Sequence, residues 1–212
     1  MFDEALSNSL VDTKMNIVGI ERVSFMESGS FGYDLERISA NAEIGRLRDQ
    51  RKADTVCLIR SPGDYWGIAW DLPSLDPWYE AHAFCIVDYN HVANYYVMGH
   101  EFGHLLGGAH DPDHVDAGRL YPDSRAWYFD TPTYGQVGTM LSYVGRRVKY
   151  YSNPSVSFDG VPTGVLNYAN NARAFNAACA LVCNYRVASA EEVEKSHREE
   201  YMAEYRAAQK QT

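Results

Sequence analysis

Three histidines and a glutamate stand close together near the middle of this 212-residue sequence, at His100, Glu101, His104 and His110. Residues four apart on a helix share one face, so His100 and His104 can present imidazole nitrogens to a single cation. Glu101 lies beside that pair without belonging to it, where its carboxylate can take a proton from a water molecule on the cation. These residue types and this spacing predict a metal site with a general base next to it.

Gly107 and His110 complete the pattern. A glycine can adopt the left-handed conformation that ends a helix and reverses the chain, which brings His110 back as a third ligand. Three neutral imidazoles with an open fourth position are typical of a catalytic zinc site rather than a closed structural one. The alternative is a helix on which two histidines fall four apart by chance, and it leaves the third histidine and the glycine unexplained.

The whole segment, His-Glu-x-x-His-x-x-Gly-x-x-His, resembles the zinc-binding motif of the metzincin metallopeptidases. Asp111, directly after the third histidine, is similar to the reprolysin-like branch. The resemblance extends over roughly 14–188 and implies a zinc-dependent endopeptidase with one catalytic Zn2+ and with Glu101 as the general base. The alternatives are a zinc hydrolase that acts on a non-protein amide and a zinc-bearing binding module without turnover.

Downstream, the segment GTMLSY (138–143) resembles the Met-turn, the tight loop beneath the metal in this family. It fits in two registers. The methionine itself makes Met140 the turn residue, whereas alignment with Thr-x-Met-Ser-Tyr puts Leu141 there. We favour Met140. In that register Tyr143 falls one position late for the oxyanion donor that some metzincins carry, so a packed tyrosine is the preferred interpretation.

Short stretches at 152–154, 160–164 and 170–173 resemble a narrower group, the bacterial peptidyl-Asp metalloendopeptidases. This resemblance implies cleavage on the N-terminal side of Asp, which requires a cation in the substrate pocket. The candidates are three cations after the Met-turn, in an otherwise acidic chain: Arg146, Arg147 and Lys149. An arginine is the better carboxylate partner because its guanidinium binds bidentately. A solvated basic loop explains the three residues equally well.

A calcium site is a weaker suggestion of the sequence. Asp111, Asp113 and Asp116 offer carboxylate oxygens, which are the ligands that Ca2+ takes in proteins. Their spacing matches no established calcium loop, and a solvated acidic loop is the preferred interpretation.

Composition limits the other partners. The formal net charge of −9 argues against nucleic acid, because neutralising phosphates requires clustered Lys and Arg. No apolar run reaches the roughly 18 residues of a membrane-spanning helix. The first residues lack the basic start and apolar stretch of a secretory signal, yet the family resemblance implies a secreted or extracellular protein, with a cytoplasmic one as the alternative. We expect a monomer that binds a protein or peptide substrate.

The elements around the motif must position it. Residues 14–25 have the β-branched content of a strand, and apolar spacing in 34–53 predicts a helix. Three short strands and a second helix then lead into the motif, at 54–60, 67–72, 83–89 and 92–107. Helical patterning returns from 167 to about 188, and 189–212 is predicted to be a charged helical tail.

This order of elements indicates an α+β or α/β plan. Together with the resemblance it implies an α+β fold with a mixed, mostly parallel sheet, an antiparallel edge strand, two long helices and a loop-rich C-terminal subdomain that ends in a helix. We predict a catalytic domain over 1–188, with an upper part at about 14–107 and a lower part at about 108–188. Strand 67–72 should form the edge above the cleft and bind the substrate as an added, extended strand.

Overall fold

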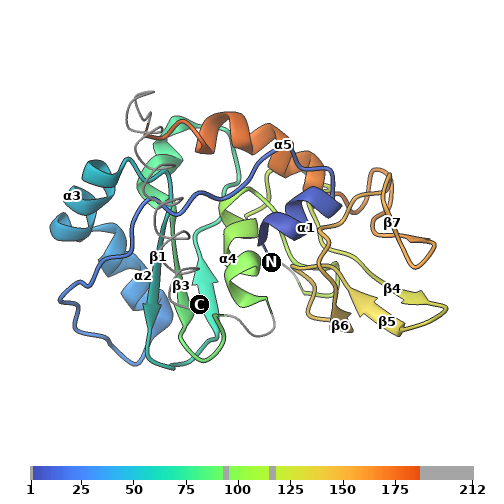
Figure 1. Ribbon diagram of the computed structural model, residues 1–212, viewed down its shortest axis with the longest axis horizontal. Helices are drawn as coiled ribbons and strands as arrows, with labels where there is room; N and C mark the ends of the chain where they lie inside the picture. The colour runs from blue at the N-terminus through green and yellow to red at the C-terminus, as the bar shows by residue number, and fades with distance from the viewer. Residues whose placement is uncertain (1, 93–95, 115–117, 187–212) are drawn as a thin grey trace, which may run out of the picture.

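A three-stranded sheet organises the first half of the chain in the computed structural model, which describes residues 2–92, 96–114 and 118–186 (Figure 1). Its strands are β1 (Val56–Arg60), β2 (Gly67–Ala69) and β3 (Phe84–Asp88), in the order β1-β3-β2. β1 and β3 run parallel, and β2 pairs antiparallel with β3 at the edge. The mixed sheet with an antiparallel edge strand is therefore confirmed.

Helices cover both faces of this sheet. Side chains alternate along β3, so Phe84 and Ile86 pack under α2 (Phe31–Ser39), whereas Cys85 packs with Phe102 of α4 on the other face. Every residue of β3 is buried, as expected for a central strand between two helical layers. The predicted metal-binding helix, α4 (Val97–Leu105), therefore packs on the face of the sheet that carries Cys85.

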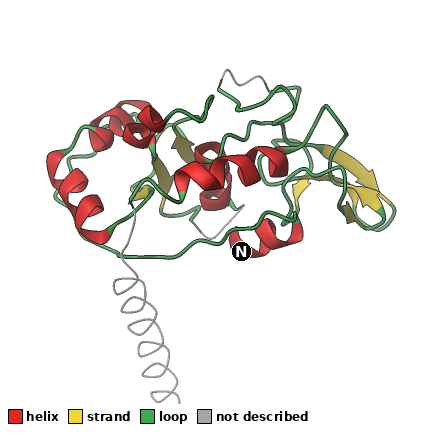
Figure 2. Cartoon of the chain, turned by 90° about the horizontal axis from the view of Figure 1, so that it is seen from above, coloured by secondary structure: helices red, strands yellow, loops and turns green. Residues whose placement is uncertain are grey.

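The short strands of the second half of the chain lie on the far side of α4, whereas its helix α5 (Asn171–Val182) runs back above α4 towards the first half (Figure 1). Figure 2 shows the molecule from above, with helices at one end and across the middle and a strand hairpin at the other end. A core that includes Met140, Leu141, Tyr151 and Phe175 joins this half to α4. The remaining elements are α1 (Phe2–Asn8), α3 (Ala42–Arg51), the 3-10 helix η1 (Pro77–His82), β4 (Tyr128–Thr131), β5 (Gly135–Gly138), β6 (Arg146–Arg147), β7 (Ser157–Phe158) and β8 (Val161–Pro162).

Two sequence predictions were wrong in detail. Residues 14–25 form no strand, because their backbone pairs with none of the described strands; Ile17 and Ile20 are 68% and 88% exposed. The helix predicted at 34–53 is two helices, α2 and α3. Asn41 begins the second one, since its side chain accepts hydrogen bonds from two backbone N–H groups of the first turn of α3.

The described part of the chain contains no helix with the length and apolar content needed to cross a bilayer. Cys57 and Cys85 are direct partners across β1 and β3, and both are free thiols. The predicted charged tail at 189–212 lies outside the described residues.

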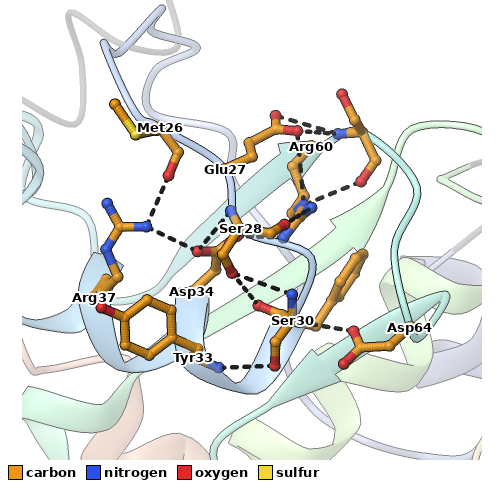
Figure 3. Close-up of polar contacts among 11 residues, drawn as sticks. Met26, Glu27, Ser28, Ser30, Tyr33, Asp34, Arg37, Arg60 and Asp64 are labelled. Carbon is orange, nitrogen blue, oxygen red and sulfur yellow. Dashed lines mark hydrogen bonds and ion pairs between the residues drawn. The ribbon is translucent and has the colours of Figure 1, made fainter.

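A buried ion pair anchors the loop that leads to the edge strand (Figure 3). Asp34 of α2 and Arg60 at the end of β1 contact each other with side chains that are 0% and 2% exposed. The Asp34 carboxylate also accepts hydrogen bonds from the Ser28 backbone N–H and from Arg37. Because the buried charges satisfy each other, the segment before α2 and the end of β1 are held together.

We predict that Asp34→Ala lowers the free energy of unfolding by about 3–5 kcal/mol, because it leaves the Arg60 guanidinium buried without its main partner. Urea denaturation measures this. Glu36→Ala is the control, since Glu36 is an exposed carboxylate on the same helix and its loss should change stability by no more than about 0.5 kcal/mol. Equal losses in the two variants would show that the ion pair is not a major source of stability.

Candidate metal centre and substrate cleft

Three imidazoles converge beside α4. The Nε2 atom of His110 lies 2.9 Å from that of His100 and 3.1 Å from that of His104. These three residues form the one group of at least three His, Cys, Asp or Glu side chains in the described chain whose ligand atoms lie within 4.8 Å of one another. His100 and His104 are buried, and His110 is partly exposed, so the group opens to solvent on one side.

Two backbone carbonyls determine which nitrogens face the centre. His100 Nδ1 lies 3.0 Å from Met140 O, and His104 Nδ1 lies 3.0 Å from Gly108 O. A carbonyl oxygen only accepts, so each Nδ1 carries the proton and each neutral ring presents a lone pair at Nε2. The Nε2 lone pairs of His100 and His104 both point at Nε2 of His110, which can donate at most one proton. Hydrogen bonds among the three rings therefore cannot satisfy both lone pairs, whereas a zinc ion can bind all three Nε2 atoms. The residues present therefore fit a zinc ion.

The environment of His100 keeps this ligand neutral. Burial lowers the pKa of His100 well below its ordinary value, and the neighbouring His104, Arg147 and His110 lower it further. Metal ligation requires unprotonated imidazole nitrogen, so this shift prepares His100 for a cation.

Gly107 reverses the chain between the second and third histidines. Its φ is +81°, in the left-handed region that favours glycine, and its N–H donates to His104 O at 2.9 Å. A Cβ there would also lie 2.7 Å from the Leu120 side chain. The turn that brings His110 back beside α4 thus depends on a residue without a side chain.

The predicted Met-turn lies directly beneath α4, with Met140 and Leu141 both buried. Each packs against a glycine of the helix: a Cβ at Gly99 would overlap the Met140 methyl group, and one at Gly103 would lie 2.7 Å from a Leu141 methyl carbon. Both candidate turn residues therefore contact the metal-binding helix, and the choice between the two registers stays a prediction.

Asp111 ties the third histidine to this turn. Its carboxylate accepts hydrogen bonds from Tyr143 N at 2.8 Å, Ser142 Oγ at 3.0 Å and His114 Nδ1 at 2.7 Å. Burial would raise the pKa of Asp111, but these hydrogen bonds, with that of His114 the largest, lower it overall. A carboxylate held in this way is part of the scaffold.

The calcium suggestion is unsupported. The Asp111 oxygens are engaged as described, Asp113 accepts a hydrogen bond from the Tyr128 hydroxyl at 2.5 Å, and Asp116 lies outside the described residues. No acidic cluster of metal-binding geometry occurs in the ranges that the structure describes.

Glu101 lies next to the triad and against the edge strand. It is 4% exposed, and a Cβ at Gly67 of β2 would overlap its carboxylate. Burial raises the pKa of Glu101 to about 8; the Arg147 charge counteracts this shift, and the Asp71 charge adds to it. The absence of a side chain at Gly67 leaves room for the Glu101 carboxylate. The sequence alone did not indicate this role of Gly67.

Tyr143 is at the centre rather than in the core. Tyr143 is 53% exposed, and its ring centroid lies 4.2 Å from that of His110 and 5.5 Å from that of His100. Its backbone N–H is fixed by Asp111, which directs the side chain over the histidines instead of inwards. The choice between a packed tyrosine and an oxyanion donor stays a prediction.

The three basic residues proposed for the substrate pocket have different surroundings in the structure. Arg147 is partly buried, donates from Nε to Ser142 O at 2.9 Å, and lies within electrostatic reach of Glu101 and His100. Arg146 is exposed and lies over the Tyr134 ring of the β4–β5 turn. Lys149 pairs with Glu4 of α1 at 2.6 Å. Arg147 is therefore the one of the three that the structure places beside the metal centre.

The sequence of residues 2–111, just over half of the chain, matches the family described as Metallo-peptidase family M12B Reprolysin-like. The chain belongs to the reprolysin-like M12B metallopeptidases. The match ends at Asp111, so it includes the three histidines and Glu101. The predicted membership of the metzincins is thus confirmed, and the histidine triad has an arrangement consistent with a site for one metal ion.

Curated relatives of this reprolysin-like chain are bacterial. A protein named "Peptidyl-Asp metalloendopeptidase" from Stenotrophomonas maltophilia (strain R551-3) is 28% identical over 188 residues, which are 84% of this chain and 44% of that protein. One of the same name from Xanthomonas campestris pv. campestris is 29% identical over 181 residues, 78% of this chain and 40% of that protein. The chain thus spans less than half the length of these relatives.

A solved structure described as "Structure of a chaperone-substrate complex" shares the fold, with a TM-score of 0.59 over 76% of this chain and 25% of that chain. At 19% identity, this likeness concerns the arrangement of the backbone alone.

We predict that Gly67→Ala lowers kcat/KM by about 10²-fold while zinc content is retained, because the new methyl group displaces the Glu101 carboxylate by about 1 Å. Proteolysis assays with metal analysis measure both quantities. Gly45→Ala on α3 is the control, since a Cβ there meets nothing within 4 Å. Unchanged turnover in Gly67→Ala would show that the carboxylate position is not critical.

Proposed function

We propose that this chain is a zinc-dependent endopeptidase with Glu101 as its general base. The observation that supports this most is the convergence of three imidazole Nε2 atoms next to a buried carboxylate. A structural zinc site closes its fourth position with another ligand and needs no base. Here the neighbouring group is a carboxylate one residue beyond a ligand, at the edge of the sheet.

Zinc held by the three histidines would lower the pKa of a water molecule and polarise the scissile carbonyl. Glu101 takes the proton of the attacking water and passes it to the leaving amine. Its burial makes the carboxylate a stronger base than an exposed one. The hydroxyl of Tyr143, whose ring lies over His110, is our candidate donor to the oxyanion that develops on the carbonyl.

β2 would bind the substrate. Its one partner among the described strands is β3, so its outer side offers backbone groups to an extended peptide. Gly67, which lies against Glu101, belongs to this strand. A peptide that pairs with β2 therefore passes close to the general base, and this is the geometry required for cleaving a chain within its length.

Arg147 is our candidate for selecting Asp on the C-terminal side of the scissile bond. The relatives named for peptidyl-Asp cleavage support this preference. A carboxylate that enters a partly buried pocket loses hydration, which a charge-assisted hydrogen bond from a guanidinium offsets. Arg147 is partly buried, and this burial lowers its pKa. Its guanidinium therefore has less hydration to lose when it binds a carboxylate.

We predict that Glu101→Gln retains about one zinc per chain but lowers the rate of casein digestion by about 10²–10⁴-fold. The substitution removes the base and leaves all three ligands in place. Metal analysis and digestion with and without a zinc chelator measure this. Near-normal digestion by Glu101→Gln would show that another group is the base, and digestion by metal-free protein would end the zinc mechanism.

We predict that Arg147→Ala lowers kcat/KM for bonds before Asp by about 10²-fold or more, with a much smaller effect on other bonds, because the carboxylate then enters the pocket unpaired. Mass spectrometry of a digested proteome gives the preference directly. Arg146→Ala is the matched control, because Arg146 is its neighbour on β6 but lies over Tyr134. Dominant cleavage before Leu or Phe by the wild-type protein would contradict an acidic preference.

A further inference from the structure

Two thiols lie opposite each other on neighbouring strands of the three-stranded sheet. In the parallel register of β1 and β3, Cys57 is the direct partner of Cys85. Partner residues in a sheet carry their side chains on the same face, and both cysteines belong to the cluster that contains Phe102 and Leu105 of α4. The two free thiols therefore lie side by side on the face of the sheet that supports the metal-binding helix.

The spacing of the strands suits a covalent bond between these thiols. Neighbouring strands lie about 4.8 Å apart, and disulfides join residues whose Cα atoms are about 4.4–6.8 Å apart. Because the register aligns Cys57 directly with Cys85, the strand separation alone meets this requirement. The loop that such a bond closes, 58–84, contains the edge strand β2 and the helix η1.

The two thiols differ in their access to solvent. Cys85 is 0% exposed on the central strand, whereas Cys57 is only partly buried on β1, an outer strand of this sheet. Burial raises the pKa of the Cys85 thiol well above its ordinary value, which makes Cys85 the less reactive of the two. An oxidant that arrives from solvent therefore meets Cys57 first.

We propose that Cys57 and Cys85 form a disulfide in the presence of a small-molecule disulfide such as oxidised glutathione, and that this bond stabilises the sheet behind α4. The Cys57 thiolate attacks one sulfur of the reagent, which forms a mixed disulfide and releases one thiol. Cys85 then attacks Cys57 Sγ and expels the second thiolate, which takes up the Cys85 proton. The chain loses two hydrogen atoms, and the reagent is reduced to two thiols. The bond forms whether or not the chain is a peptidase.

The experiment treats the full chain with oxidised glutathione under native conditions, alkylates the remaining thiols and maps a tryptic digest by mass spectrometry. Trypsin cuts after Arg60, which separates the two cysteines, so the bond appears as a linked pair of peptides. We expect this pair to contain Cys57 and Cys85. We also expect Tm to rise by about 5–10 °C, because closing the loop restricts the unfolded chain. A reducing agent should reverse the rise.

Cys57→Ser is the test variant, because a partly exposed position tolerates the change, and it should lose both the linked peptides and the rise in Tm. Cys179→Ser is the matched control, because it removes a thiol of the other closely spaced pair, Cys179 and Cys183 at the end of α5. It should keep both effects.

Four results would overturn the proposal. They are alkylation of both Cys57 and Cys85 after oxidation, a stable glutathione adduct at Cys57, linkage of Cys179 to Cys183 alone, and a linked Cys57–Cys85 pair without a rise in Tm.

Discussion

The metal centre depends on two hydrogen bonds from imidazole Nδ1 atoms to backbone carbonyls, one at Met140 and one at Gly108. They fix the tautomer and ring orientation of His100 and His104, so that lone pairs meet where a cation can lie. Both carbonyls belong to segments outside α4. The site therefore exists only when the loop after the helix and the turn beneath it are folded against the helix, and small residues at Gly99 and Gly103 permit that approach.

Charge in the cleft follows from the same packing. Glu101 is buried between the helix and the edge strand, and burial of a carboxylate is costly unless neighbours compensate. The Arg147 charge compensates in part by lowering the pKa of Glu101, whereas the Asp71 charge raises it. This combination gives a carboxyl whose affinity for protons is higher than normal.

The contacts that position the edge strand β2 lie away from the metal centre. The loop between β1 and β2 is held to the start of α2, because the Phe31 N–H donates to Asp64 Oδ1 at 2.8 Å and Arg60, at the end of β1, pairs with Asp34 of α2 (Figure 3). A Cβ at Gly63 would lie 2.7 Å from the Phe31 ring. These contacts determine where β2 begins, and hence where Gly67 meets Glu101. Stability and catalytic geometry are thus linked through one short loop.

The sequence by itself determined the histidine triad, Glu101, the glycine turn and the positions of the three central strands along the chain, because helical spacing, glycine conformations and alternation of apolar residues are local properties of the chain. It failed at 14–25, where strand content found no pairing partner, and at Asn41, where a cap divided a predicted helix. Only the tertiary structure separated Arg147 from Arg146 and Lys149, and brought Tyr143, Gly67 and Asp71 to the centre. Those positions depend on contacts between residues far apart in sequence, which local sequence patterns cannot predict.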